Sequence, residues 1–252
     1  MSVIFISDIH LGLGSREKER AKENALLGFL KAKLPATEAL FIVGDLFDFW
    51  FEYKTVIPKG FHRTLAALQE YTDRGIKVYY LAGNHDYWMK DYFSTELGFE
   101  VHFTPFEVRL NGKRILLHHG DGLAMNDYGY RFIKPILRNR LSIWLYRWLH
   151  PDIGVRLARG SSRSSREYTS SKSSDEERGL KEFAASRIAE GVDIVIMGHQ
   201  HKPSQLQIDK GTYVNLGDWI SHYTYAELQD GIIALRNWKS ESSTTDGNVR
   251  QA

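Results

Sequence analysis

The chain has 252 residues, of which 42% are hydrophobic and 25% are charged, and it contains no cysteine. Such a composition is that of a folded globular protein, and it excludes a wholly disordered chain, a disulfide framework and a thiolate metal site. The formal net charge of +2 is too small to indicate nucleic acid or membrane as a partner of the whole surface. The first residues show neither a basic leader nor a long apolar run, so we expect a cytoplasmic protein without a spanning helix.

Strands and helices alternate in the predicted first half of the chain. Apolar runs at residues 3–7 and 39–43 predict strands, and charged segments at 17–32 and 60–74 carry apolar residues at helical spacing. A further strand is predicted over 77–81. This alternation is typical of a parallel sheet with helices on its faces.

The second half shows shorter strands. Asn111-Gly112 separates two β-prone runs, 106–110 and 113–117, which predicts a hairpin. The other elements expected are a helix over 175–190 and strands over 193–197, 205–209, 212–215 and 231–236. We expect the strands of this half to pair antiparallel.

An unusual aromatic and basic segment lies between these halves. Residues 130–150 have a helical period, and a Ser-rich stretch with cationic residues follows at 161–174. The segment is either a packed helix with a solvated basic face or a surface that faces lipid. The domains we expect are a core over 1–128 and 175–239, an inserted helical cap with its Ser-rich loop over 129–174, and a disordered tail over 240–252.

Metal-ligand residue types follow five of the apolar runs. They are Asp8 and His10, Asp45, Asn84, His119, and His199 and His201. A single Asp after a strand more often caps a turn than binds a ligand, but five repetitions predict a shared site at one edge of a sheet. On an extended backbone the pairs Asp8/His10 and His199/His201 would each point one way. We choose His119 over His118 because it directly precedes Gly120, and we expect His118 to be a buried, hydrogen-bonded residue on the other face.

Oxygen and imidazole donors without a thiolate suit Mn²⁺, Fe²⁺, Zn²⁺ or Co²⁺, and the oxygen share favours Mn²⁺. Two divalent ions need a bridging anion, which Asp45 would supply, and they can acidify a water for in-line hydrolysis at phosphorus. His85 would stabilise charge or protonate the leaving oxygen, and Asp86 would orient it. The alternative for both residues is a purely supporting role.

Five motifs resemble those of the calcineurin-like metallophosphoesterases. They are Asp8-Ile9-His10, Gly44-Asp45-Leu46-Phe47-Asp48, Gly83-Asn84-His85-Asp86, His119-Gly120-Asp121 and Gly198-His199-Gln200-His201. The resemblance implies an α/β fold, a four-layer α/β/β/α sandwich with an inserted helical cap. It also implies one ion held by Asp8, His10, Asp45 and His201, and a second by Asp45, Asn84, His119 and His199.

Within that superfamily the chain looks most like the UDP-2,3-diacylglucosamine pyrophosphohydrolases of lipid A biosynthesis. This likeness implies cleavage of the pyrophosphate to UMP and 2,3-diacylglucosamine 1-phosphate, with the acyl chains held by the inserted helices. The substrate contacts it implies are Asn84, His85, Asp127, Ser165, Thr169, Lys172 and His199. The chain departs from the subfamily pattern at His85, where many members have Arg, and at Thr169, where Asn is expected.

Other functions remain open at this point. His85 is the generic residue of the superfamily, so a phosphodiesterase or phosphatase of broader range is the main alternative. A metal-free scaffold on the same fold would be expected to lack metal ligands, and the chain retains all of them. We expect a lipid-linked nucleotide as substrate and transient contact with the cytoplasmic face of the inner membrane as a peripheral protein. We expect no nucleic-acid partner and predict no protein partner.

Overall fold

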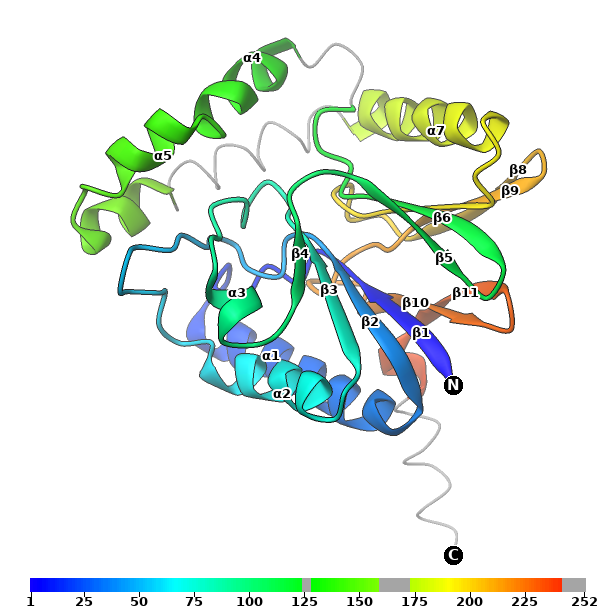
Figure 1. Ribbon diagram of the computed structural model, residues 1–252, viewed down its shortest axis with the longest axis horizontal. Helices are drawn as coiled ribbons and strands as arrows, with labels where there is room; N and C mark the ends of the chain where they lie inside the picture. The colour runs from blue at the N-terminus through cyan, green and yellow to red at the C-terminus, as the bar shows by residue number, and fades with distance from the viewer. Residues whose placement is uncertain (124–127, 159–172, 242–252) are drawn as a thin grey trace, which may run out of the picture.

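The computed structural model describes residues 1–123, 128–158 and 173–241. Two β-sheets pack face to face, and helices cover the outer face of each sheet (Figure 1). The predicted four-layer α/β/β/α sandwich is therefore confirmed.

The first sheet has the strand order β11-β10-β1-β2-β3-β4. Strands β1 to β4 run parallel, whereas β10 pairs antiparallel with both β1 and β11. The bounds are β1 Ser2–Ile6, β2 Thr37–Val43, β3 Lys77–Leu81, β4 Glu100–His102, β10 Thr224–Gln229 and β11 Ile232–Asn237. The sequence analysis did not predict β4 and β10.

The second sheet has the order β5-β6-β7-β9-β8. Its bounds are β5 Phe106–Leu110, β6 Lys113–His118, β7 Ile194–Met197, β8 Ser204–Ile208 and β9 Gly211–Asn215. The hairpin at Asn111-Gly112 is confirmed, with both residues at positive φ. The expectation of an antiparallel half was wrong at the centre of the sheet, where β7 runs parallel to both β6 and β9. A long loop and β8 separate β7 from β9, which gives the chain room to return in the same direction.

Helices cover the two outer faces. Helices α1 (Arg16–Lys33) and α2 (His62–Asp73) pack on the first sheet, and α7 (Ser173–Ala189) packs on the second. A short 3₁₀ turn, η1 (Leu34–Ala36), follows α1, and α3 (Tyr92–Thr95) precedes β4. The alternating pattern of β1 shows why the layers form, because Val3 and Phe5 face the other sheet while Ile4 and Ile6 face the helices.

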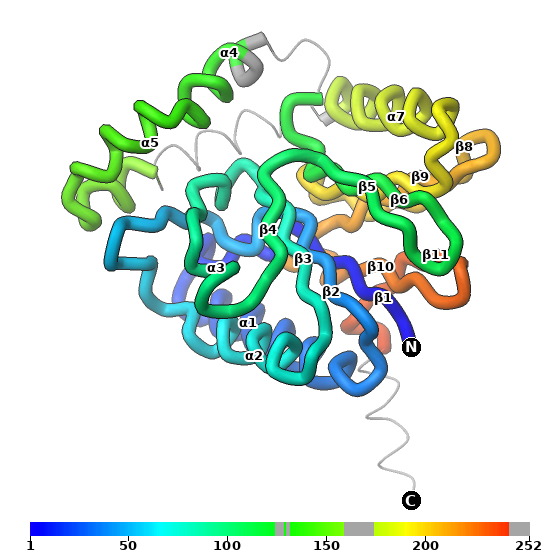
Figure 2. The backbone as a smooth tube through the Cα atoms, viewed as in Figure 1, coloured from blue at the N-terminus to red at the C-terminus, as the bar shows by residue number. Residues whose placement is uncertain are grey.

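The inserted segment forms a separate arm along one end of the sandwich (Figure 2). It contains α4 (Tyr128–Leu137), α5 (Arg140–Tyr146) and a helical stretch over 151–158. The single helical run that we expected over 130–150 is broken at Asn139. The Asn139 side chain accepts a hydrogen bond from the Leu141 backbone N–H at 2.8 Å, so it caps the start of α5.

The predicted tail begins with two residues that contact the core. Ser240 lies after the last strand, and its backbone N–H donates to the Asn237 side chain. Glu241 pairs with Lys33 at 3.3 Å and accepts from the Tyr225 hydroxyl. Residues 242–252 lie outside the described residues. Across the part of the chain that the structure describes, no helix is long and apolar enough to cross a membrane.

Candidate metal centre

Five loops at the strand ends carry the seven predicted ligands. They follow β1, β2 and β3 of the first sheet and β6 and β7 of the second. Five of the seven residues have φ between +47° and +70°, in the left-handed region; they are Asp8, His10, Asp45, His199 and His201. The extended geometry that we expected for the two pairs is therefore wrong, and a sharp left-handed turn brings each side chain into the site.

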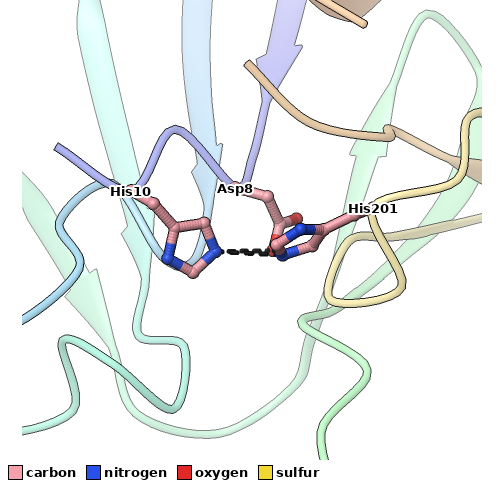
Figure 3. A group of neighbouring side chains, drawn as sticks. All are labelled: Asp8, His10 and His201. Carbon is pink, nitrogen blue, oxygen red and sulfur yellow. Dashed lines mark hydrogen bonds and ion pairs between the residues drawn. The ribbon is translucent and has the colours of Figure 1, made fainter. Parts of the chain in front are cut away.

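The first group joins the β1 loop to the β7 loop (Figure 3). Nε2 of His10 lies 3.0 Å from Nε2 of His201, and Oδ1 of Asp8 lies 3.3 Å from the same His201 nitrogen. Among the described residues, this buried Asp8 oxygen has no hydrogen-bond partner. The backbone N–H of His199 donates to the other oxygen of Asp8 at 2.9 Å, which ties the two loops together.

The second group gathers residues from four loops. Nε2 of His119 lies 3.2 Å from Oδ2 of Asp45 and 3.1 Å from the Asn84 side-chain oxygen. Asp45, His119 and His199 each offer a ligand atom within 4.8 Å of the others. Nδ1 of His119 donates to the Val43 carbonyl at 2.9 Å, so its Nε2 is the nitrogen that faces the group.

Asp45 lies between the two groups. Its Oδ2 is 3.2 Å from Nε2 of His119 and 3.7 Å from Nε2 of His10. Its Oδ1 accepts the backbone N–H of His85 at 2.9 Å, which fixes the carboxylate. The position is the one that the resemblance implied for a bridging ligand.

Three glycines make room for the ligand side chains. A Cβ at Gly44 would overlap the His119 ring, and one at Gly83 would overlap the Asp45 carboxylate. A Cβ at Gly198 would overlap Ser7 and Asp8. The loops therefore approach as closely as they do only because these positions lack a side chain.

The electrostatics of the site are dominated by its carboxylates. Burial disfavours a charged His10, but the carboxylates of Asp48 and Asp8 outweigh it and raise the His10 pKa to about 9. In the same way Asp45 outweighs burial and raises the pKa of His119 to about 10. The neighbouring His119 holds the pKa of Asp45 well below its usual range despite burial. The site thus concentrates negative charge that attracts cations.

His85 and Asp86 lie beside the two groups and have different surroundings. Nδ1 of His85 donates to the Asp48 carbonyl at 2.9 Å, and burial lowers the His85 pKa. The Asp86 carboxylate accepts hydrogen bonds from the Tyr80 hydroxyl and from two backbone N–H groups, those of Leu46 and Gly83. Burial raises the Asp86 pKa to about 6. These contacts place Asp86 as a link between two ligand loops.

The sequence analysis did not predict that two further carboxylates would lie beside the candidate ligands. Oδ1 of Asp48 lies 3.6 Å from Nδ1 of His10, and Oε1 of Glu176 lies 3.2 Å from Nε2 of His199. Asp48 follows Asp45 by three residues within a quoted motif, a signal that could have found it. Glu176 reaches the site from α7, and nothing local in the sequence indicates it.

His118 is buried at the end of β6, where its Nδ1 accepts the Gly120 backbone N–H at 2.7 Å. Its ring lies 5.2 Å from that of Phe183 on α7, so the choice of His119 as the site residue agrees with the geometry. The predicted substrate contacts Asp127, Ser165, Thr169 and Lys172 lie outside the described residues.

The donor set fits a divalent metal centre. Such a centre requires a buried carboxylate oxygen that makes no hydrogen bond, as Oδ1 of Asp8 does not within the described chain. It also requires imidazole nitrogens turned toward carboxylates and glycines that leave space for the ligands, and both are present. Oxygen and nitrogen donors alone exclude a soft thiolate site.

Comparisons with known proteins agree with this geometry. A family model described as calcineurin-like phosphoesterase matches residues 1–203. The chain is 34% identical to the UDP-2,3-diacylglucosamine hydrolase of Porphyromonas gingivalis, over 93% of this chain and 97% of that protein. It is also 34% identical to the proteins of that name from Stutzerimonas stutzeri, over 86% and 90%, and from Pseudomonas aeruginosa, over 87% and 91%. The match extends over nearly the full length of these relatives.

Proposed function

Because the chain belongs to the calcineurin-like phosphoesterase family, we propose that it hydrolyses the pyrophosphate of UDP-2,3-diacylglucosamine to UMP and 2,3-diacylglucosamine 1-phosphate. The names of the relatives support this substrate. The observation that carries the hydrolytic part is the convergence of the five ligand loops on Asp45, whose Oδ2 lies within 3.7 Å of histidines from both groups. In this reaction the oxygen of one water forms a bond to a phosphorus of the pyrophosphate, the bond from that phosphorus to the bridging oxygen breaks, and the protons of the water pass to the products or to solvent.

We propose a pair of Mn²⁺ ions as the cofactor. Asp8, His10 and His201 would hold one ion, Asn84, His119 and His199 the other, and Asp45 both. Bound there, such ions supply Lewis acidity and lower the pKa of a water. The chain fixes the ligands in advance, because Val43 orients His119 and the His199 backbone N–H orients Asp8.

His85 would contact a phosphate oxygen through Nε2, while its Nδ1 donates to the Asp48 carbonyl. Because Nδ1 already donates to Asp48, a donor at Nε2 requires the doubly protonated ring. Burial lowers the pKa of His85, so the protonated ring would readily give its second proton to a leaving oxygen. Asp86 would keep the loops of Asn84 and Asp45 in register. Asp127, Ser165, Thr169 and Lys172, together with Asn84 and His199, are proposed to bind the substrate.

A pocket of about 510 Å³ between the core and the inserted segment is where we place acyl chains. It starts beside the centre at Leu11 and Asp48, and it reaches the helical stretch at Val155. Apolar walls and a few charged groups are what a lipid with a phosphate requires. The aromatic residues Trp144 and Trp148 of the inserted segment are at least half exposed and do not line this pocket.

That exposure supports a membrane-facing role for the cap, which we propose to span 129–174. Ten of the fourteen exposed large hydrophobic residues in the described chain lie between Phe132 and Leu157. Arg140 and Arg156 lie in the same segment. Apolar and cationic side chains together suit the surface of an anionic bilayer, so we propose transient, peripheral contact with the cytoplasmic face of the inner membrane.

The proposal is tested by UMP release from the diacylated substrate with metal-stripped protein and added Mn²⁺. Asp45→Asn should abolish turnover, whereas Asp230→Asn should leave it unchanged. Asp230 is a matched control because it also has positive φ, 51° against 53° for Asp45, but lies in the exposed β10–β11 turn. Retained turnover in Asp45→Asn would reject the site.

Substrate class is tested separately at the pocket. Val56, which lines the pocket and is 48% exposed, can be changed to Asp with little risk to the fold. We expect Val56→Asp to lower kcat/KM for the diacylated substrate at least about tenfold, and to spare a small chromogenic phosphodiester. If removal of the acyl chains leaves kcat/KM of the unaltered protein unchanged, a broader phosphoesterase is the correct function.

A further inference from the structure

Glu176 is a buried carboxylate beside a proposed ligand. Glu176 is only 4% exposed, and its Oε1 lies 3.2 Å from Nε2 of His199. Acidic side chains are rarely buried unless they are paired, and the contact with His199 is one of the interactions that accompany the burial of this carboxylate.

Glu176 is positioned by the packing of its helix on the second sheet. It lies near the start of α7, which is held on the second sheet by three buried residues, Leu180, Ala184 and Ile188. His199 lies in the loop after β7, a central strand of the same sheet. Helix and loop are therefore fixed to one structural unit, and the distance between the two side chains is set by that unit.

We propose that Glu176 is a positioning residue that keeps the proton of His199 on Nε2 and so turns Nδ1 toward Asp45 and His119. A carboxylate attracts an N–H group, and a neutral imidazole carries its proton on one nitrogen only. The nitrogen opposite Glu176 is then the one with a lone pair. Nδ1 of His119 is fixed in the same way by the Val43 carbonyl, which leaves Nε2 for the site.

The ring positions agree with this role. The His119 and His199 rings lie 5.1 Å apart at 65°, edge to face, and both belong to the group with Asp45. Carboxylates behind a metal-binding histidine set its tautomer and raise its basicity, and their loss typically weakens metal binding about 10- to 100-fold. The inference rests on the metal centre of the proposed function. Within that centre, Glu176 would affect the affinity of the ion site that contains His199.

The next residue provides a matched control. Glu177 pairs with Lys202 at 2.7 Å and with Lys181 at 2.6 Å, outside the ligand groups. Glu176→Gln and Glu177→Gln thus remove the same charge from the same turn of α7, but only the first removes a carboxylate from a histidine.

The decisive experiment is calorimetric titration of Mn²⁺ into metal-stripped wild type and both variants, with unfolding temperature as a check on folding. We expect two sites in the wild type, one of them about 10- to 100-fold weaker in Glu176→Gln, and both unchanged in Glu177→Gln. Wild-type affinity at both sites in Glu176→Gln, or equal weakening in the two variants, would overturn the role of Glu176. Absence of binding by the wild type would instead reject the metal centre itself.

A second measurement does not depend on a variant. Long-range ¹H–¹⁵N spectra of the wild type loaded with diamagnetic Zn²⁺ should show His199 protonated at Nε2 and ligated through Nδ1. The opposite assignment would overturn the inference even if Glu176→Gln failed to fold.

Discussion

Nε2 of His10 and Nε2 of His201 lie 3.0 Å apart, although 191 positions separate the two residues in the chain. His10 follows the central strand of the first sheet and His201 follows a strand of the second, so the contact closes the sandwich at one end. Two imidazole nitrogens this close, with the Asp8 carboxylate beside them, have the arrangement that the proposed cation site requires. Assembly of the centre therefore depends on the packing of the two sheets.

Metal uptake should release protons. His10 has its pKa raised to about 9 and His119 to about 10, so both rings are protonated at pH 7 in the metal-free protein. An ion must displace these protons, and its apparent affinity should rise with pH until those pKa values are passed. Titration of Mn²⁺ at pH 7 in two buffers of different ionisation enthalpy measures the protons released. Equal heats in both buffers would show that the histidines are already neutral.

Gly198→Ala should disrupt the centre through a steric effect alone. A Cβ at this position would overlap the side chains of Ser7 and Asp8, so the loop of His199 must move. We expect loss of at least one of the two Mn²⁺ equivalents, measured by elemental analysis after dialysis.

The control for that variant is Gly28→Ala in α1. The nearest atom to a Cβ there is 3.9 Å away, in Trp238, and alanine is the better helix former. Metal content should be unchanged in this variant. Full metal content in Gly198→Ala would show that the loop is not as tightly packed as the structure indicates.

Asp121→Asn should loosen the cap. The Asp121 carboxylate is nearly buried and lies 2.7 Å from Lys134 and 2.8 Å from Arg138, both on or next to α4. Arg138 also lies over the ring of Tyr87. Removing one partner of this cluster should lower the free energy of unfolding by about 1–3 kcal/mol. Urea unfolding measures the loss, and Asp152→Asn, an exposed change in the same segment, is the control.

The pH dependence of that loss follows from the direction of the shift. Burial would raise the pKa of Asp121, but Arg138, His119 and Lys134 outweigh it and hold the pKa well below its usual range. A carboxyl group with a depressed folded-state pKa stabilises the fold above its unfolded pKa of about 4 and loses that contribution at lower pH. The difference between wild type and Asp121→Asn should therefore shrink as the pH falls below about 4. A difference independent of pH would indicate a packing effect.

Lys22→Met should weaken the half of the centre that contains His10. The Lys22 ammonium is buried, donates to the His10 carbonyl at 2.5 Å and pairs with Glu19 at 2.9 Å. Glu19 in turn accepts the backbone N–H groups of Gly12 and Gly14. Methionine has a side-chain volume similar to that of lysine but removes the cation that pairs with Glu19. The loop over residues 10–14 should therefore become more mobile. Amide hydrogen exchange in residues 10–14 should increase, and unchanged exchange would contradict a holding role.

The candidate ligands could be picked out from the sequence because each of these Asp, Asn and His residues lies within four positions of the end of an apolar strand. The backbone conformation could not, since the positive φ of Asp8 and His10 has no local residue signal comparable to that of Asn111-Gly112. Short β4 lacked enough residues for a pattern, and the break at Asn139 depends on a cap inside an otherwise helical run. Glu176 escaped notice because its contact with His199 exists only after α7 packs on the sheet.

The most direct test of the central claim is a crystal structure of the protein grown with Mn²⁺, with anomalous scattering recorded at the manganese edge. Two peaks about 3.5–4 Å apart, one on each side of Asp45, are the predicted result. A single peak away from Asp45, or no peak at a saturating concentration of Mn²⁺, would contradict the dinuclear centre.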